Sequence, residues 1–183
     1  KAEVDEGAVT SYLTHGYVPS PATLFKGVRQ LLPGHSLVVE NGEIRTRRYW
    51  DVNYEVDWDS KPEYFQERLV ELVDDSIKVH LRSDVPVGSY VSGGIDSSLM
   101  AILASRHDDS NQEAFHGRFL EYPGYDESRF AEMAVASSGG SMNMLDLTHE
   151  DFATHLHDVI YHLDYPVAGP GSFPQFMVSK LAA

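Results

Sequence analysis

Residues 92–98 read Ser-Gly-Gly-Ile-Asp-Ser-Ser, a run whose residue types suit the binding of phosphate groups. The two glycines let the main chain approach a ligand closely, and the serines add hydroxyl donors. The apolar run 85–91 predicts a strand before this motif, and the run 99–104 predicts a helix after it. A strand, a tight turn and a helix N-terminus together form a phosphate cradle, because the first N–H groups of a helix lack internal partners.

Asp96 is the residue of this motif that a simple phosphate site would not contain. The motif also lacks the Lys-Ser or Lys-Thr pair that closes a Walker A loop. A carboxylate repels phosphate unless a divalent cation lies between them, so we interpret Asp96 as a Mg²⁺ ligand. The alternative is a glycine-rich turn in which Asp96 or Ser97 caps the helix. The strand and helix expected on either side favour nucleotide chemistry.

The composition is that of an ordinary globular protein, with 42% hydrophobic and 23% charged residues in a chain of 183. A formal net charge of -14 disfavours nucleic acid and anionic membrane surfaces as partners. No apolar stretch approaches the roughly 20 residues that a membrane span needs. The chain has no cysteine and no signal-peptide pattern at its acidic start, so we expect a cytoplasmic protein.

An acidic connector, residues 51–60, separates two segments with different patterns. Before it, a short helical patch at 9–13 ends at Gly16. Two strands follow, 35–40 and 44–50, joined by a hairpin turn at Asn41-Gly42. After the connector, apolar residues at three- and four-residue steps predict a helix from Pro62 that packs against a sheet, with Ser60 as its N-cap.

From residue 85 onward, predicted strands and helices alternate. This alternation predicts an α/β fold, with helices flanking a parallel sheet that is incomplete because only three strands are present. The phosphate cradle then lies at the carboxyl end of a strand, where open α/β sheets bind ligands. The strands are expected at 87–91, 114–119 and 142–147, and the helices at 97–106, 126–137, 149–163 and from about Phe173.

Several polar side chains outside the cradle have both a structural and a functional interpretation. Arg118 could contact a phosphate, but pairing with a surface acid is favoured. Asp126 is expected to be a helix N-cap, and Thr148 with Asp151 forms a variant capping box. Three histidines lie on one predicted helix, and no two are four residues apart as a zinc-binding pair would be, which favours solvated or helix-end side chains over a zinc site: His155, His157 and His162.

The 92–98 motif resembles the pyrophosphate-binding loop of PP-loop ATP pyrophosphatases, which cleave ATP to AMP and pyrophosphate. With its other motifs, the whole chain resembles the middle of the glutamine-dependent asparagine synthetases. The motifs that carry this resemblance are Tyr12-Leu13 with Gly16-Tyr17-Val18-Pro19, Phe25-Lys26-Gly27-Val28, Leu32-Pro33-Gly34-His35, Arg48-Tyr49-Trp50, Val85-Pro86-Val87-Gly88, Phe115-His116-Gly117-Arg118-Phe119, Tyr125-Asp126-Glu127-Ser128 and the segment from Asp164 to Ser172.

This resemblance implies a division of the chain into two partial domains. Residues 1–50 would be the β-rich tail of an Ntn-type glutamine amidotransferase domain, 51–60 a linker, and 61–183 the N-terminal part of a PP-loop synthetase domain. Family members begin with a glutamine-hydrolysing cysteine and carry an acidic Gly-rich motif and a lysine further downstream. We therefore expect this chain to be a fragment, inactive alone, and we assign it no catalytic residue.

The resemblance also implies which residues bind the nucleotide. The pyrophosphate portion of ATP would lie on the cradle residues, with Asp96 on Mg²⁺: Ser92, Gly93, Gly94, Asp96, Ser97 and Ser98. The adenine would contact main-chain groups of Val91 and Gly117. At residues 116–119 the chain reads His-Gly-Arg-Phe, where the commoner family pattern is Ser-Val-Gly-Phe.

The family's reaction implies small-molecule partners, namely ATP, aspartate and glutamine-derived ammonia. Aspartate would be adenylated, and ammonia would then displace AMP to give asparagine. Two alternatives remain open. One is a related amide-forming enzyme, such as a β-lactam synthetase-like protein, that acts on another carboxylate. The other is a non-catalytic assembly domain. Relatives often pair through their glutaminase halves, so a homodimer is a candidate assembly.

Overall fold

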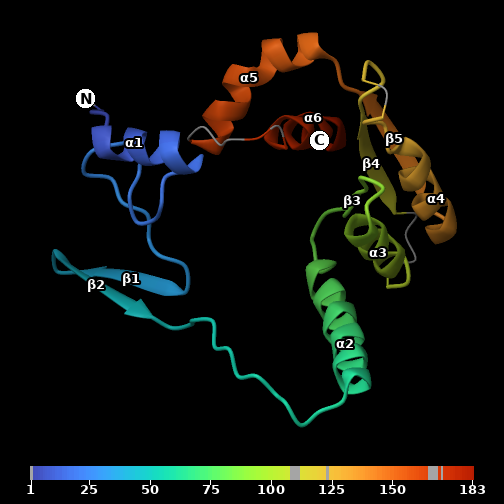
Figure 1. Cartoon of the computed structure of the whole chain (residues 1–183), viewed down its shortest axis with the longest axis horizontal. Coiled ribbons are helices and arrows are strands. Elements are labelled where there is room, and N and C mark those ends of the chain that lie inside the picture. The colour runs from blue at the N-terminus through green and yellow to red at the C-terminus, as the bar shows by residue number, and fades with distance from the viewer. Residues whose placement is uncertain (1, 108–111, 123, 165–168, 170) are drawn as a thin grey trace. The chain divides into compact units, whose positions relative to one another are not determined.

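The computed structural model describes residues 2–107, 112–122, 124–164, 169 and 171–183 (Figure 1). The chain divides into two compact units, which are Lys1–Trp58 with Ile160–Gly169, and Asp59–Val159 with Pro170–Ala183. Among the described residues, no helix combines the length and the apolar character that crossing a membrane requires.

The first unit contains the helix α1 (Glu6–His15), whose start and end are both set by local signals. The carboxylate of Asp5 accepts a hydrogen bond from the N–H of Ala8 at 3.1 Å and so caps the helix start. Gly16 ends the helix with a left-handed φ of 78°. The predicted helical patch and its stop at Gly16 are confirmed, and the helix extends beyond the patch at both ends.

A β-hairpin follows, formed by β1 (His35–Glu40) and β2 (Glu43–Arg48). The strands pair antiparallel, with His35 opposite Arg48. Asn41 and Gly42 join them with φ values of 52° and 81°, the positive φ angles that a type I′ turn requires. The predicted hairpin is therefore confirmed, although β2 begins one residue earlier and ends two residues earlier than expected.

The second unit is built on a sheet of three strands in the order β3 (Ser89–Tyr90), β4 (Glu113–Arg118) and β5 (Ser141–Asp146). Both neighbouring pairs are parallel, which confirms the predicted α/β class. β3 is shorter than the predicted strand 87–91.

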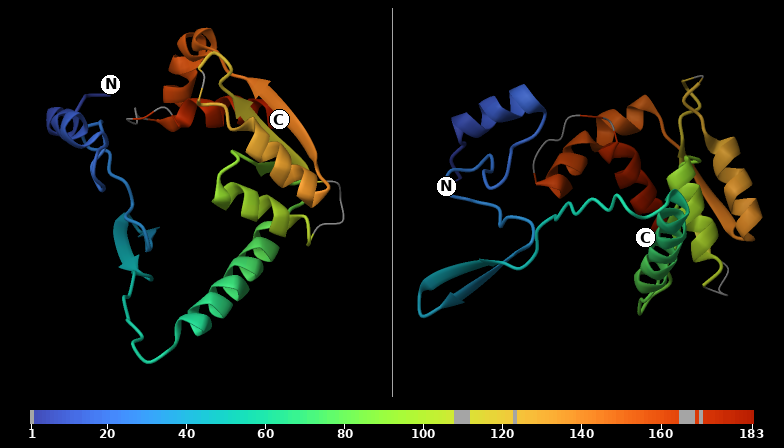
Figure 2. Two further views of the ribbon diagram at one scale, coloured as in Figure 1. Left: turned by 45° about the vertical axis from the view of Figure 1, so that its right-hand side comes forward. Right: turned by 60° about the horizontal axis from the view of Figure 1, so that its bottom comes forward.

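Helices cover both faces of this sheet (Figure 2). α3 (Ile95–Ala104) and α4 (Ser128–Ser138) lie together on one face, and α6 (Ser172–Ala182) lies on the other. Small side chains let α3 and α4 approach the sheet closely. They form a buried core of Val91, Ala101, Ala114, Ala131, Ala134 and Val135. The helices predicted at 97–106, at 126–137 and from about Phe173 are thus present as α3, α4 and α6. α3 begins two residues before its expected start.

The helix α2 (Pro62–His80) differs from its prediction in two respects. Its N-cap is Lys61 rather than Ser60, and Lys61 makes no side-chain capping bond. The helix packs on α3 rather than on the sheet, and Ile77 is its one buried residue. Asp74 connects α2 to the end of α3 through a 2.5 Å contact with the ring of His107. The apolar periodicity was therefore sufficient to predict the helix but not its neighbour.

The last long helix, α5 (His149–Leu163), begins with the predicted capping box. The carboxylate of Asp151 accepts from the N–H of Thr148 at 3.0 Å, and the Thr148 hydroxyl accepts from the N–H of Asp151 at 3.1 Å. The hydrogen bonds from the Thr148 side chain and main chain lower the pKa of Asp151 below its ordinary value of 3.8. The ionised carboxylate thus stabilises the start of α5.

We predict that Asp151→Ala lowers the melting temperature at pH 7 and that this difference shrinks on acidification. Because the pKa of Asp151 is lowered in the folded chain, its stabilising contribution is present above pH 3.8 and is lost as the pH falls through the folded-state pKa. Thermal unfolding from pH 7 to pH 3 measures the effect. Glu150→Ala, which removes a neighbouring first-turn charge, is the control. An Asp151→Ala deficit that is the same at both ends of this range would contradict the prediction.

Candidate functional site

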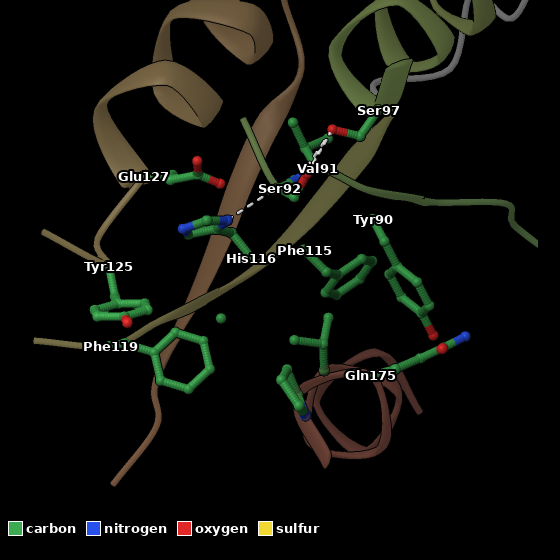
Figure 3. Close-up of a pocket in the computed structure, with 13 residues that line it drawn as sticks. Tyr90, Val91, Ser92, Ser97, Phe115, His116, Phe119, Tyr125, Glu127 and Gln175 are labelled. Atoms are coloured by element: carbon green, nitrogen blue, oxygen red, sulfur yellow. Dashed lines mark hydrogen bonds between the residues drawn. The ribbon is translucent and has the colours of Figure 1, made fainter. Parts of the chain in front are cut away.

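A pocket of about 390 Å³ opens at the carboxyl ends of β3 and β4 (Figure 3). This volume is within the range of small-molecule binding sites. Four predicted site residues line it: Val91, Ser92, Ser97 and Gly117. The rest of the wall comes from β3, β4, the start of α4 and the start of α6: Tyr90, Phe115, His116, Phe119, Tyr125, Glu127, Pro174, Gln175 and Val178.

The cradle loop is held in shape by its own hydroxyl groups. The oxygens of Ser92 and Ser97 lie 2.9 Å apart, a hydrogen bond visible in Figure 3. The N–H of Ser92 donates to the Ser97 hydroxyl at 3.2 Å, and the N–H of Gly94 donates to the Ser92 hydroxyl at 3.3 Å. The loop is therefore folded against the first turn of α3 without any ligand.

The first turn of α3 supplies the groups that an anion needs. Gly94 is the N-cap and makes no side-chain capping bond, so the alternative with Asp96 or Ser97 as N-cap is wrong. A helix has no internal acceptor for its first N–H groups, here those of Ile95, Asp96 and Ser97, and its positive dipole end attracts anions. The Asp96 side chain is exposed beside these donors. Amides for phosphate oxygens and one carboxylate for a hard cation form a donor set that fits Mg²⁺-nucleotide.

The two glycines of the cradle have different structural roles. Gly93 has a φ of 91°, and a Cβ atom there would lie 2.8 Å from the Glu127 carbonyl oxygen and 3.1 Å from the Ala131 nitrogen. The loop therefore touches the main chain of α4, and only glycine permits this approach. Gly94 has a φ of -68°, and the nearest atom to its Cβ would be the Ser92 hydroxyl at 3.4 Å. The surrounding protein atoms thus leave space for a side chain at Gly94.

The main chain of Val91, predicted to contact adenine, is already bonded on both sides by β4. Its N–H donates to the Phe115 carbonyl at 3.0 Å, and its carbonyl accepts from Nδ1 of His116 at 2.7 Å. One carbonyl lone pair therefore remains for a ligand. Gly117 has a packing role as well. A Cβ there would lie 2.8 Å from Leu147 and 3.2 Å from Val178, so its absence lets α6 approach the sheet.

His116 is the pocket residue whose position sequence reasoning missed. Its side chain is 5% exposed, and its Nε2 atom has no hydrogen-bond partner among the described residues. The sequence did mark this position, because the chain has a histidine where the commoner family pattern has a serine. The bond to Val91 could not be foreseen, because it joins residues 25 positions apart through the register of two strands.

Two charged residues near the pocket make local interactions. Arg118 lies 2.6 Å from the Asp146 carboxylate, which confirms the favoured pairing with an acid. Asp126 accepts from the N–H of Ser128 at 3.0 Å, and the hydrogen bonds of Ser128 lower the pKa of Asp126. The N-cap of α4 is nevertheless Glu127, so the prediction of Asp126 as N-cap was wrong by one residue.

The histidines of α5 form no evident metal site. In the described ranges, no group of three or more His, Cys, Asp or Glu side chains could hold a metal ion. The prediction of a solvated side chain is wrong for His155, which is 19% exposed and whose ring centre lies 5.8 Å from that of Phe176. The segment from Asp164 to Ser172, one of the motifs that carry the resemblance, falls partly outside the described residues.

Comparison with protein families finds two matches along the chain. A model described as asparagine synthase matches residues 68–183, and a glutamine amidotransferase domain model matches residues 1–50. The two matches fall on either side of the acidic connector, residues 51–60, that separates the two sequence patterns.

Individual relatives carry related names. The chain is 31% identical over 181 residues to asparagine synthetase [glutamine-hydrolyzing] 1 of Bacillus subtilis (strain 168), covering 98% of this chain and 28% of the relative. It is 29% identical to a putative asparagine synthetase [glutamine-hydrolyzing] 2 of Methanocaldococcus jannaschii, covering 100% of this chain and 35% of the relative. Amidase chyE of Penicillium rubens is 32% identical over 79% of this chain and 24% of its own length. The chain thus spans about a third or less of these relatives.

The contrast between the two glycines yields a prediction. Gly93→Ala should lower the free energy of unfolding by about 1–3 kcal/mol, because it forces a positive φ and a clash with the α4 main chain. Gly94→Ala should leave stability nearly unchanged but weaken the binding of Mg²⁺-ATP, because its methyl group would occupy the approach to the cradle. Urea unfolding and calorimetric titration of both variants measure these effects. Equal loss of stability in the two variants would contradict the proposed division of roles.

Proposed function

Because this chain belongs to the asparagine synthase family, we propose that its second unit binds the pyrophosphate portion of ATP on the cradle of a PP-loop synthetase domain. The observation that carries the proposal is the loop at the carboxyl end of β3. Its Ser92 and the first-turn residue Ser97 line a pocket of nucleoside size, and the neighbouring Asp96 is exposed in the same turn of α3. The ligand contacts are assigned to Val91, Ser92, Gly93, Gly94, Asp96, Ser97, Ser98 and Gly117.

We propose the same division of the chain that the resemblance implied. Residues 1–50 form the tail of an Ntn-type glutamine amidotransferase domain, 51–60 a linker, and 61–183 the start of the synthetase domain. The two family matches, which cover residues 1–50 and 68–183, support these boundaries. The whole protein would then use small molecules as partners, and a homodimer remains a proposal.

The residues of the cradle act by positioning and by local charge. The N–H groups at the start of α3 and the hydroxyls of Ser92, Ser97 and Ser98 donate to phosphate oxygens, which fixes the leaving pyrophosphate. The carboxylate of Asp96 holds Mg²⁺, which when bound offsets the negative charge of the phosphates. In the structure the Ser92 and Ser97 hydroxyls bond to each other, and the Ser97 hydroxyl donates to the Gly94 carbonyl at 3.2 Å, so each must turn from its present partner to donate to a phosphate. The first N–H groups of α3 need no such change.

The reaction that we propose for the whole protein is glutamine-dependent amide formation. The side-chain carboxylate of aspartate attacks the α-phosphorus of ATP and pyrophosphate leaves. Ammonia from glutamine then attacks the activated carbonyl, AMP leaves, and asparagine is formed. The names of the relatives support this choice of acceptor.

A second candidate is the same chemistry on a different carboxylate. Relatives named amidase from two fungi match 79% and 88% of this chain, so similar chains also occur in proteins with other names. The described lining of the pocket contains no arginine or lysine that would identify the acceptor carboxylate. A non-catalytic assembly domain is the third alternative, and the intact donor set of the cradle argues against it.

The deciding experiment is pyrophosphate release by the full-length protein with Mg²⁺-ATP, ammonia and a panel of carboxylates that includes aspartate. We expect release that depends on aspartate and yields asparagine. Release with another acceptor would favour the second candidate. No release with any acceptor, together with no thermal protection by saturating Mg²⁺-ATP, would favour the assembly domain.

We predict that Asp96→Ala reduces pyrophosphate release by at least roughly 100-fold, since loss of a direct metal ligand should exceed the effect of losing an outer-shell group. The melting temperature should change little, because the Asp96 side chain is exposed. Asp75→Ala, which removes an exposed carboxylate from α2, is the matched control. Wild-type turnover in the Asp96 variant would refute its role as a metal ligand.

A further inference from the structure

We propose that His116 recognises the nucleoside part of the bound nucleotide by accepting a hydrogen bond at Nε2 from a donor on the base or the ribose. The inference rests on the proposed nucleotide site and adds a specificity-determining side chain to it. It is independent of the main-chain contacts assigned to Val91 and Gly117.

The hydrogen bond at the other end of the ring fixes the chemistry of Nε2. Nδ1 of His116 lies 2.7 Å from the carbonyl oxygen of Val91, which can only accept. Nδ1 therefore carries the proton, and in the neutral ring Nε2 presents a lone pair. That atom is buried in the pocket wall without a partner among the described residues. A buried acceptor without a partner is unfavourable, so a ligand that supplies a donor recovers free energy on binding.

The surroundings of Nε2 indicate where the donor would come from. This end of the ring is directed toward the side of the pocket where Tyr125 and Glu127 lie (Figure 3). Tyr125 is 75% exposed, so a ligand can displace its side chain without breaking a packed core. The Glu127 side chain, when ionised, is a second acceptor on the same side.

The two ends of the site thus have opposite hydrogen-bonding character. The cradle presents donors, namely the first N–H groups of α3, whereas the His116 side presents acceptors. ATP has the complementary arrangement, since its phosphates only accept hydrogen bonds, whereas the 6-amino group of its adenine and its ribose hydroxyls can donate them. The bond between His116 and Val91, the residue before the cradle, places both ends in one site.

The first test compares nucleotides that lack one donor each. The full-length protein is titrated calorimetrically with the Mg²⁺ complexes of ATP, purine riboside triphosphate, 2′-deoxy-ATP and 3′-deoxy-ATP. The analogue that lacks the donor to Nε2 should bind roughly three- to ten-fold more weakly than ATP. A deficit confined to purine riboside triphosphate identifies the 6-amino group, and a deficit confined to a deoxy analogue identifies that ribose hydroxyl.

Two substitutions separate the ends of the ring. His116→Asn places an amide near the Nδ1 position and can keep the bond to Val91, but it removes the group at Nε2. His116→Gln reaches the Nε2 position but cannot make the same bond to Val91. We expect the asparagine variant to bind ATP and the sensitive analogue equally. The glutamine variant should keep the discrimination, and the asparagine variant, which can keep the bond to Val91, should bind pyrophosphate like the wild type.

The outcomes distinguish this inference from the proposed function. Equal binding of all four nucleotides by the wild type, or discrimination that persists in His116→Asn, would overturn the role of His116 and leave the cradle intact. Absence of binding for both ATP and pyrophosphate would overturn the nucleotide site itself. If the asparagine variant fails to fold, the analogue series on the wild type and the glutamine variant still decide the question.

Discussion

The attachment of Val91 to β4 is the constraint on which the site depends. Val91 is 1% exposed, and both of its main-chain groups are hydrogen-bonded across the sheet, one to Phe115 and one to His116. The next residue begins the cradle, so the register of β3 on β4 decides where the loop starts. Because β3 itself is only two residues long, these bonds at its carboxyl end contribute much of its pairing.

From that fixed point, the loop is shaped by contacts that engage its serine hydroxyls but leave the first N–H groups of α3 without an internal acceptor. Gly93 lies against the main chain of α4, and the hydroxyls of Ser92 and Ser97 bond to each other. The first turn of α3 is thereby held with its N–H groups facing outward. A cradle that is ordered before binding avoids the entropy cost of ordering it on the ligand.

Much of the fold followed from local signals in the sequence, because those signals act within a few residues. Asn41-Gly42 fixed the hairpin turn, and the Thr148–Asp151 pair fixed the start of α5. Neighbours distant in the sequence were harder to predict. The periodicity of α2 indicated a helix but not that it packs on α3, and nothing local placed His116 against the Val91 carbonyl. For the site, the position of the 92–98 loop between a strand and a helix could be predicted, whereas the orphaned Nε2 required the strand register.

The distribution of charge around the cradle explains why a carboxylate belongs in a phosphate site. The chain carries a net charge of -14, and Arg118, the cation considered for a phosphate, is paired with Asp146. Favourable potential for an anion must therefore come from the α3 N-terminus and from a bound cation. Under the proposed function, Asp96 would repel phosphate when it is bare and attract it through a metal, and its position in the first turn would make the divalent cation part of the recognition.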